Sequence, residues 1–254
     1  MKTITIIILL LSVFLPSSGQ EIKMKSENAK LVLDFIGCIK LYNKEKLSGI
    51  IDFPFDREYP LPSIKNKQEF IQRYAEVFDD SLSQLIVNSN LNQDWAEVGW
   101  RGIMFMRGQV WLGYDGRLLA VNYQSAAEKN KLADLVQAEK LLLHSSLNKF
   151  EKPICILETS KNRIRIDDLG NANYRYTSWK IQEKMSAQPE IIIEHGEFIS
   201  EGTGGNHKFE FRNGNYIYDC EIIVMDEPDS PPAYLTILKN NKEVLSEPAQ
   251  IIKH

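Results

Sequence analysis

The stretch 202-GTGGNHKFEFRNGNYIYDC-220 decides how the second half of the chain is interpreted. Its glycines suggest at first a loop that binds phosphate. A Walker-type loop, however, ends in Lys followed by Ser or Thr and leads into a helix, and neither follows here. The dinucleotide-binding fingerprint also fails, because His207 stands where its third glycine is required. We therefore predict a glycine-rich hairpin loop followed by two strands, which the tight turn Asn213-Gly214 joins. Along these strands the aromatic side chains share faces in pairs: Phe209 with Phe211, and Tyr216 with Tyr218.

The same alternation of polar and apolar residues runs through the C-terminal part of the chain, where helical periodicity is absent. Glu151-Lys152-Pro153 marks its start. Strand-like segments follow one another, with Gly, Asn, Asp and Pro turns roughly every 8–14 residues, a spacing typical of all-β domains. These segments are 154–160, 163–168, 173–180, 190–200, 207–213, 215–225 and 233–240. We expect residues 151–254 to form a small all-β barrel or sandwich.

The N-terminal part combines helices with a meander of strands. Apolar residues recur at helical spacing within 27–47, 63–89 and 125–150, whereas the period changes to two between Trp95 and Tyr123. The meander reads as three strands with turns at Arg107-Gly108 and Asp115-Gly116. Strands in hairpins that do not alternate with helices argue against a doubly wound fold. We therefore expect residues 20–150 to form an α+β domain.

This helix–meander–helix pattern resembles the NTF2-like, cystatin-type α+β fold. The resemblance covers residues 28–145 and rests on helices followed by the meander 98-VGWRGIMFMRGQVWL-112. It implies helices packed on a curved antiparallel sheet, which together form a cup. The whole chain also resembles a class of uncharacterised exported proteins of Gram-negative bacteria. Neither likeness implies an activity, because a fold by itself does not assign one.

The N-terminus is typical of a secretory signal peptide. Lys2 precedes the apolar run 4-ITIIILLLSVFL-15, which is shorter than the roughly 20 residues that span a bilayer. Pro16 follows, and Ser17 and Gly19 are small residues suited to a cut after residue 19. We expect residues 1–19 to be removed and the rest to be exported to the periplasm or the cell exterior, without membrane insertion. An N-terminal membrane anchor is the alternative.

Charge and cysteine usage narrow the class of partner. The formal net charge is −4 and no block of Lys and Arg stands out, which argues against nucleic acid as a partner.

An exported protein can keep a disulfide, and Cys155 and Cys220 lie in strand-like segments that could pair. Cys38 lies among apolar helix residues and is expected to be a buried thiol. No Cys or His spacing indicates a metal site, and no cofactor is expected.

No catalytic motif is found, and we predict no catalytic residues. The chain has no G-x-S-x-G nucleophile motif, and paired carboxylates such as Asp79-Asp80 are adjacent, as in helix caps and turns. A non-enzymatic protein is therefore the first hypothesis. The alternative is an NTF2-like enzyme that acts on a small substrate with a polar residue of the cup, such as Asp94, Glu97 or Tyr123.

Two groups of aromatic residues are the candidate binding residues. Each group has two interpretations, because aromatic side chains fill cores and also form partner or ligand surfaces. The groups are Trp95, Trp100 and Trp111 in the meander, and Tyr174, Tyr176, Trp179, Tyr216 and Tyr218 in the β region. We predict an exported binding protein whose target is a protein or a small apolar ligand. A narrower hypothesis is an inhibitor or immunity protein against a toxin or hydrolase.

Overall fold

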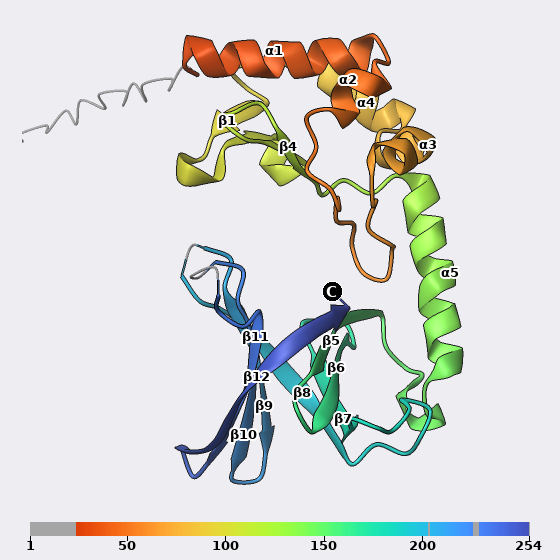
Figure 1. The fold of residues 1–254 in the computed structure, drawn as a ribbon, viewed down its shortest axis with the longest axis vertical. Coiled ribbons are helices and arrows are strands. Elements are labelled where there is room, and N and C mark those ends of the chain that lie inside the picture. Colours follow the sequence, from red (N-terminus) through yellow and green to blue (C-terminus); the bar gives the residue numbers. More distant parts are fainter. Residues whose placement is uncertain (1–23, 203, 226–228, 254) are drawn as a thin grey trace, which may run out of the picture.

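The chain forms a helical part with a small sheet, followed by a β-barrel (Figure 1). The structure is a computed structural model that describes residues 24–202, 204–225 and 229–253. The predicted signal peptide, residues 1–19, lies outside the described residues. Helix α5 (Ala126–Leu142) runs from the helical part down to the barrel and connects them.

Four helices precede the sheet: α1 (Ser26–Lys40), α2 (Lys44–Ser48), α3 (Lys67–Val77) and α4 (Asp80–Val87). Polar side chains cap three of them, because Asn43, Asn66 and Asp79 accept hydrogen bonds from the first-turn backbone N–H groups. Asp79, expected with Asp80 in a helix cap or turn, caps α4 and divides the helical segment 63–89. The single helix expected over 27–47 is interrupted instead, since Tyr42 takes a positive φ of 53° between α1 and α2.

The small sheet has four short strands in the order β1-β2-β3-β4, all antiparallel. They are β1 (Trp95–Glu97), β2 (Ile103–Phe105), β3 (Val110–Leu112) and β4 (Leu118–Val121). Short 3-10 turns, η1 (Gly99–Arg101) and η2 (Met106–Gly108), separate the first three strands. The meander was expected to have three strands but has four, because the 3-10 turn η1 divides its first strand into β1 and β2. One face of the sheet packs against the helices through Trp95, Phe105 and Val110.

The predicted fold class is wrong in its central feature. Strands of three or four residues, broken by 3-10 turns, do not build the curved sheet of an NTF2-like cup. The buried face of this sheet is already filled by the helices and belongs to one apolar core with Val32, Phe35 and Phe70. The larger sheet is the C-terminal one, and it is a closed barrel of eight strands. The molecule is a mixture of helices and strands, but its arrangement is not an NTF2-like cup followed by a small barrel.

The prediction of a β-barrel is confirmed. Its strands follow one another around the barrel in chain order, and β12 pairs with β5 to close it. They are β5 (Lys152–Glu158), β6 (Asn162–Asp168), β7 (Tyr174–Lys180), β8 (Ile191–Ser200), β9 (His207–Asn213), β10 (Tyr216–Ile222), β11 (Ala233–Lys239) and β12 (Lys242–Lys253). The stretch 207–222 forms the hairpin β9–β10, as its alternation predicts. Closure leaves the barrel without an open edge.

Side chains fill the interior of the barrel, as is usual for eight strands. The fully buried members include Leu157, Ile164, Ile166, Phe211, Cys220 and Leu235. Gly196 makes room for one of them, because a Cβ at this position would lie 2.1 Å from the Phe211 ring. A bulge next to it, where His195 has a φ of 64°, bends β8. The barrel therefore has an apolar core of its own.

A third cluster joins α5 to the outer face of the barrel. Val136, Leu143, Leu147, Phe150 and Trp179 pack together where α5 ends and the 3-10 turn η3 (Ser145–Leu147) begins. Buried charges lie beneath this layer: Asp167 accepts from Arg165 Nε at 2.7 Å and from Arg175 Nη2 at 2.7 Å. Both guanidinium groups lie over the Phe150 ring. The end of α5 is thus fixed to the barrel wall. No helix in the described ranges is long and apolar enough to cross a membrane.

Candidate functional site: the cleft between the helical part and the barrel

The main cleft lies between the helical part and the barrel and has a volume of about 770 Å³. Three segments that are far apart in the sequence form its walls: the loop 52–59, β4 with the residues after it, and the start of β5. Both polar and apolar side chains line it. The polar ones include Asp52, Asp56, Arg57, Glu58, Gln124 and Lys152, and the apolar ones include Phe55, Leu119 and Ile154.

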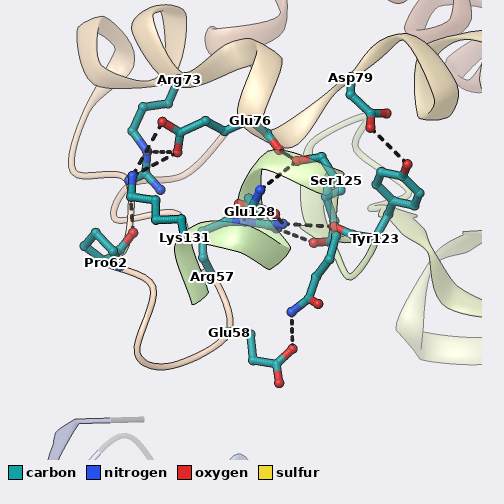
Figure 2. Close-up of polar contacts among 12 residues, drawn as sticks. Arg57, Glu58, Pro62, Arg73, Glu76, Asp79, Tyr123, Ser125, Glu128 and Lys131 are labelled. Atoms are coloured by element: carbon teal, nitrogen blue, oxygen red, sulfur yellow. Dashed lines mark hydrogen bonds and ion pairs between the residues drawn. The ribbon is translucent and has the colours of Figure 1, made fainter. Parts of the chain in front are cut away.

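A buried ion pair forms the inner wall of the cleft (Figure 2). Arg57 Nη2 lies 2.5 Å from Glu128 Oε2, and Arg57 Nε donates to the other oxygen at 2.7 Å. The same guanidinium donates to the carbonyls of Val121 and Tyr123, at and just beyond the end of β4. Arg57 therefore covers the end of the outer edge of β4, which Ile51 bridges at Leu118 and which no named strand of the described residues pairs. Its charge is balanced by Glu128 and is not available to a ligand.

Charged groups at the mouth of the cleft are exposed and paired only loosely. Glu58 accepts from Lys152 Nζ at 3.1 Å and, through its other oxygen, from the side chain of Gln124. This pair crosses the cleft from the loop to the barrel. Burial alone would lower the pKa of Lys152, but its hydrogen bond to Glu58 and nearby carboxylates raise the pKa. Asp52 pairs with Arg117, and Asp56 accepts from the Ser63 hydroxyl.

A second polar cluster holds the loop and α5 against α3 (Figure 2). Arg73 Nε donates to Glu76 at 2.9 Å, and Arg73 Nη1 donates to the Pro62 carbonyl at 3.0 Å. Lys131 of α5 reaches Glu76 at 3.2 Å, and the Ser125 hydroxyl donates to the Glu76 carbonyl. Burial raises the pKa of Glu76, but the hydrogen bonds from Arg73 and Lys131 outweigh it and lower the pKa. The loop 52–59 is thereby fixed at Arg57, and the chain beyond it is fixed at Pro62.

The three predicted tryptophans of the meander have three different environments. Trp95 is buried, contacts Phe105 with ring centroids 4.7 Å apart, and donates from Nε1 to Ser89 Oγ at 2.8 Å. Trp111 is half-buried on the sheet face that points away from the helices. Trp100 is 60% exposed and lies beside Arg101. They form no common pocket, and none of them lines the cleft.

The predicted aromatic residues of the barrel belong mainly to its core. Tyr176 and Tyr218 are buried and in contact, and Tyr174 and Tyr216 are half-buried at the same interior cluster. Trp179 is fully buried beneath the end of α5. Of the two interpretations given for this group, the structure therefore favours packing over an exposed partner surface.

The polar residues considered for an enzyme are not brought together. Asp94 accepts from the backbone N–H of Asn90, and Tyr123 donates to Asp79 at 3.1 Å. Glu97 accepts from Asn28 and from the backbone N–H of Lys25, and these hydrogen bonds lower its pKa. Asp94 thus closes a turn of its own segment, whereas Glu97 binds the start of α1 and Tyr123 binds the N-cap of α4.

The three cysteines are free, buried thiols. Cys155 and Cys220 lie in the barrel core, and the disulfide considered for them is not formed in the structure. Burial raises the pKa of Cys155 from 9.0 to about 12 and also raises the pKa of Cys220. Within residues 24–202, 204–225 and 229–253, no group of three or more His, Cys, Asp or Glu side chains could hold a metal ion.

The residues of the cleft were not found from the sequence. Three prolines within 48–62 exclude a helix and predict a loop, but nothing in this segment marks it as a binding site. Two of these prolines, Pro54 and Pro60, follow cis peptide bonds. Asp52 precedes Pro54, and Asp56 and Glu58 lie between Pro54 and Pro60, so three carboxylates close together in a loop are a local signal. Nothing local, however, shows that Lys152 lies opposite them.

Comparisons with known proteins find no matching family model, no matching curated protein and no matching solved structure. No relative therefore tests the resemblance to NTF2-like proteins. The geometry of the cleft is the basis for a functional proposal.

Proposed function

We propose that this chain is a non-enzymatic binding protein that holds a segment of a protein partner in the cleft between the helical part and the barrel. The observation that carries the proposal is the cleft itself, with a volume of about 770 Å³ and an inner wall fixed by the buried Arg57–Glu128 pair. Pockets of roughly 300–1,000 Å³ are typical of sites that bury a ligand of drug-like size. Preformed walls also reduce the ordering that binding requires.

The chemistry of the walls supports a protein segment over a small apolar ligand. Carboxylates, an ammonium group and an amide surround the mouth, whereas apolar contact is provided by Phe55, Leu119 and Ile154. Mixed surfaces of this kind are usual where proteins bind one another. An apolar ligand is better matched to the barrel interior, but its core is occupied by side chains such as Phe211 and Ile164.

The catalytic alternative, an NTF2-like enzyme, receives less support than binding. It assumes an NTF2-like cup, and Asp94, Glu97 and Tyr123 bond to three different partners. Export to the periplasm or the cell exterior belongs to the proposal and rests on the signal-peptide pattern of residues 1–19. An inhibitor or immunity protein is the narrower form of the same proposal, because such proteins act by binding one protein partner.

Site-specific photo-crosslinking in the producing cells tests the proposal. A photoreactive phenylalanine analogue replaces Leu119, which lines the cleft and is 47% exposed. The matched control position is Val244, which is 57% exposed near the β11–β12 turn. We expect one protein to be crosslinked from position 119 and not from 244, with the contact mapped by mass spectrometry. The same set of adducts from both positions, or none from position 119, would refute the proposal.

A further inference from the structure

We propose that the segment held in the cleft is cationic, and that its Lys or Arg side chain replaces Lys152 as the partner of Glu58. This inference rests on the proposed function and names the chemistry of the partner. It concerns the residues at the mouth of the cleft. Their ion pairs indicate the sign of the charge that a bound ligand should carry.

The carboxylates of the mouth outnumber the cations that face them. Asp52, Asp56 and Glu58 line the cleft; Lys152 faces Glu58, and Arg117, which lies outside the lining, is shared by Asp52 and Asp115. Arg57 also lines it, but its guanidinium is neutralised by Glu128 and bonded to two carbonyls. The excess of negative charge is complementary to a basic partner. The net charge of the chain, −4, has the same sign and favours the encounter with such a partner.

The existing ion pairs at the mouth can be exchanged at small cost. The side chains of Lys152 and Glu58 are 44% and 41% exposed, and those of Arg117 and Asp52 are 51% and 73% exposed. Exposed pairs of this kind contribute little to stability, because water and salt screen them. Asp56 is exposed and accepts a hydrogen bond from the Ser63 hydroxyl. This donor is neutral, so it does not balance the charge of the Asp56 carboxylate. A ligand ammonium or guanidinium group therefore finds carboxylates that are only weakly held.

Apolar groups beside the carboxylates select a peptide over a free metal ion or a small amine. Leu119 and Ile154 line the cleft next to the charged mouth, and Phe55 lies at its buried side. Lys and Arg carry long aliphatic stems below their charged heads, and such stems pack on apolar surface. A side chain of this shape matches a cleft with an acidic mouth and apolar walls.

The experiment uses three octapeptides with blocked ends and identical apolar residues, whose three polar positions are all Lys, all Glu or all Gln. Each is titrated into the isotopically labelled chain from residue 20 onward, and amide chemical shifts of Leu119 and Gln124 are followed by NMR at low salt. We expect the Lys peptide to bind at least fivefold more tightly than the Gln peptide. Raising the salt to 0.5 M should remove most of this difference.

Variants assign the effect to the mouth of the cleft. Glu58→Gln is expected to weaken binding of the Lys peptide two- to fivefold, and adding Asp56→Asn should weaken it further. Glu243→Gln is the matched control, because Glu243 is exposed at the start of β12 and does not line the cleft. It should leave the affinity unchanged. All three positions are exposed, so the variants are expected to fold, which circular dichroism verifies.

The outcomes separate this inference from the proposed function. Equal binding of the Lys and Gln peptides, tighter binding of the Glu peptide, or no shifts at Leu119 and Gln124 would overturn the cationic partner. If the crosslink from position 119 maps to a partner segment without Lys or Arg, the binding function stands and this inference fails. If position 119 yields no partner while the Lys peptide binds at the mouth, the charge preference stands and the binding function fails.

Discussion

The hydroxyl of Tyr59 donates a 2.5 Å hydrogen bond to Glu139, whose other carboxylate oxygen lies 2.8 Å from Arg165 Nη1. Glu139 of helix α5 thereby contacts both Tyr59 of the loop 52–59 and Arg165 of strand β6. The side chain of Arg165 is 1% exposed and that of Glu139 is 14% exposed, so this pair is screened little by water. Burial, followed by the hydrogen bond to Glu139, raises the pKa of Tyr59. The carboxylate is therefore the central contact between the two parts of the molecule.

Replacing Glu139 with Gln should lower the free energy of unfolding by about 1–3 kcal/mol, because the change removes a charged partner from the buried Arg165. Urea unfolding followed by circular dichroism measures the loss. Tyr59→Phe removes only the hydroxyl and should cost about 1 kcal/mol. A Glu139→Gln variant as stable as the original chain would show that the junction contributes nothing to folding.

The ion pair beneath the cleft should be costly to break. Arg57→Met leaves the fully buried Glu128 carboxylate without a cation, for which a loss of about 3–5 kcal/mol is expected. Arg117→Met is the matched control, because this arginine pairs with Asp52 and Asp115 at the surface. There the loss should stay below about 1 kcal/mol. Similar losses for the two variants, measured by urea unfolding, would contradict the assigned role of Arg57.

Gly196→Ala should destabilise the barrel by about 1–3 kcal/mol, because the added Cβ would overlap the Phe211 ring in the core. The matched substitution is Gly37→Ala in α1, where nothing lies within 4 Å of the new Cβ. It should stabilise the protein by about 0.5–1 kcal/mol, since Ala favours the helix. Thermal unfolding of both variants tests the opposite signs. A stable Gly196→Ala variant would mean that Phe211 does not pack over this position.

Trp95 and Trp100 should respond differently to truncation. Trp95→Ala empties a buried site in contact with Phe105 and should cost about 3–5 kcal/mol. Trp100→Ala removes an exposed ring and should change stability by no more than about 0.5 kcal/mol. Fluorescence should support this, since loss of Trp100 removes emission from a solvated indole. Comparable destabilisation by both substitutions would show that Trp100 is packed.

The stability of the fold should fall at high pH. Burial raises the pKa of Cys155 from 9.0 to about 12 and that of Tyr74 from 10.0 to about 12. The unfolded chain therefore releases these protons first, so the stabilisation is complete below about pH 9 and is lost as the pH rises towards 12. Unfolding free energies at pH 8 and pH 11 measure the difference. Unchanged stability at pH 11 would contradict the burial of these groups.

The native thiols should also be unreactive at pH 8, because all three are buried and burial raises the pKa of each. A chromogenic thiol reagent should react with three groups after denaturation and only slowly before it. Mass analysis without reductant provides the control: an intact Cys155–Cys220 disulfide in the purified protein would contradict the free thiols of the structure.

Local patterns in the sequence predicted local structure well. The alternation in 207–213 and 216–222 with Asn213-Gly214 between them specifies a hairpin, because each signal acts within a few residues. The helix restart at Asp79 was predictable for the same reason, since a cap bonds to the first turn of its own helix. The spacing of the strand-like segments predicted an all-β barrel or sandwich, and the structure forms the barrel.

The fold of the helical part and the cleft depend on contacts that a local pattern does not contain. The period of two in 95–123 is real, but 3-10 turns interrupt it, and helical residues fill the face that a cup would leave open. Glu58 and Lys152 meet across the cleft although 94 positions separate them. The aromatic residues predicted as candidate binding residues serve mainly for packing, whereas the cleft is lined by a charged loop.

The pairing of β12 with β5 has a consequence for how the protein acquires its structure. Leu157 lies opposite Ile251, so the contact that closes the barrel joins the first and last of its strands. The chain between β5 and β12 is a long loop, and closing it is slow. The β5–β12 ladder cannot form until β12 is available. Until then β5 and β12 each present an unpaired edge, to which another chain can add. The interval between synthesis and closure is thus the period in which this protein is most exposed to aggregation, and substitutions that weaken Ile251 or Leu157 should lower its yield before they alter its binding.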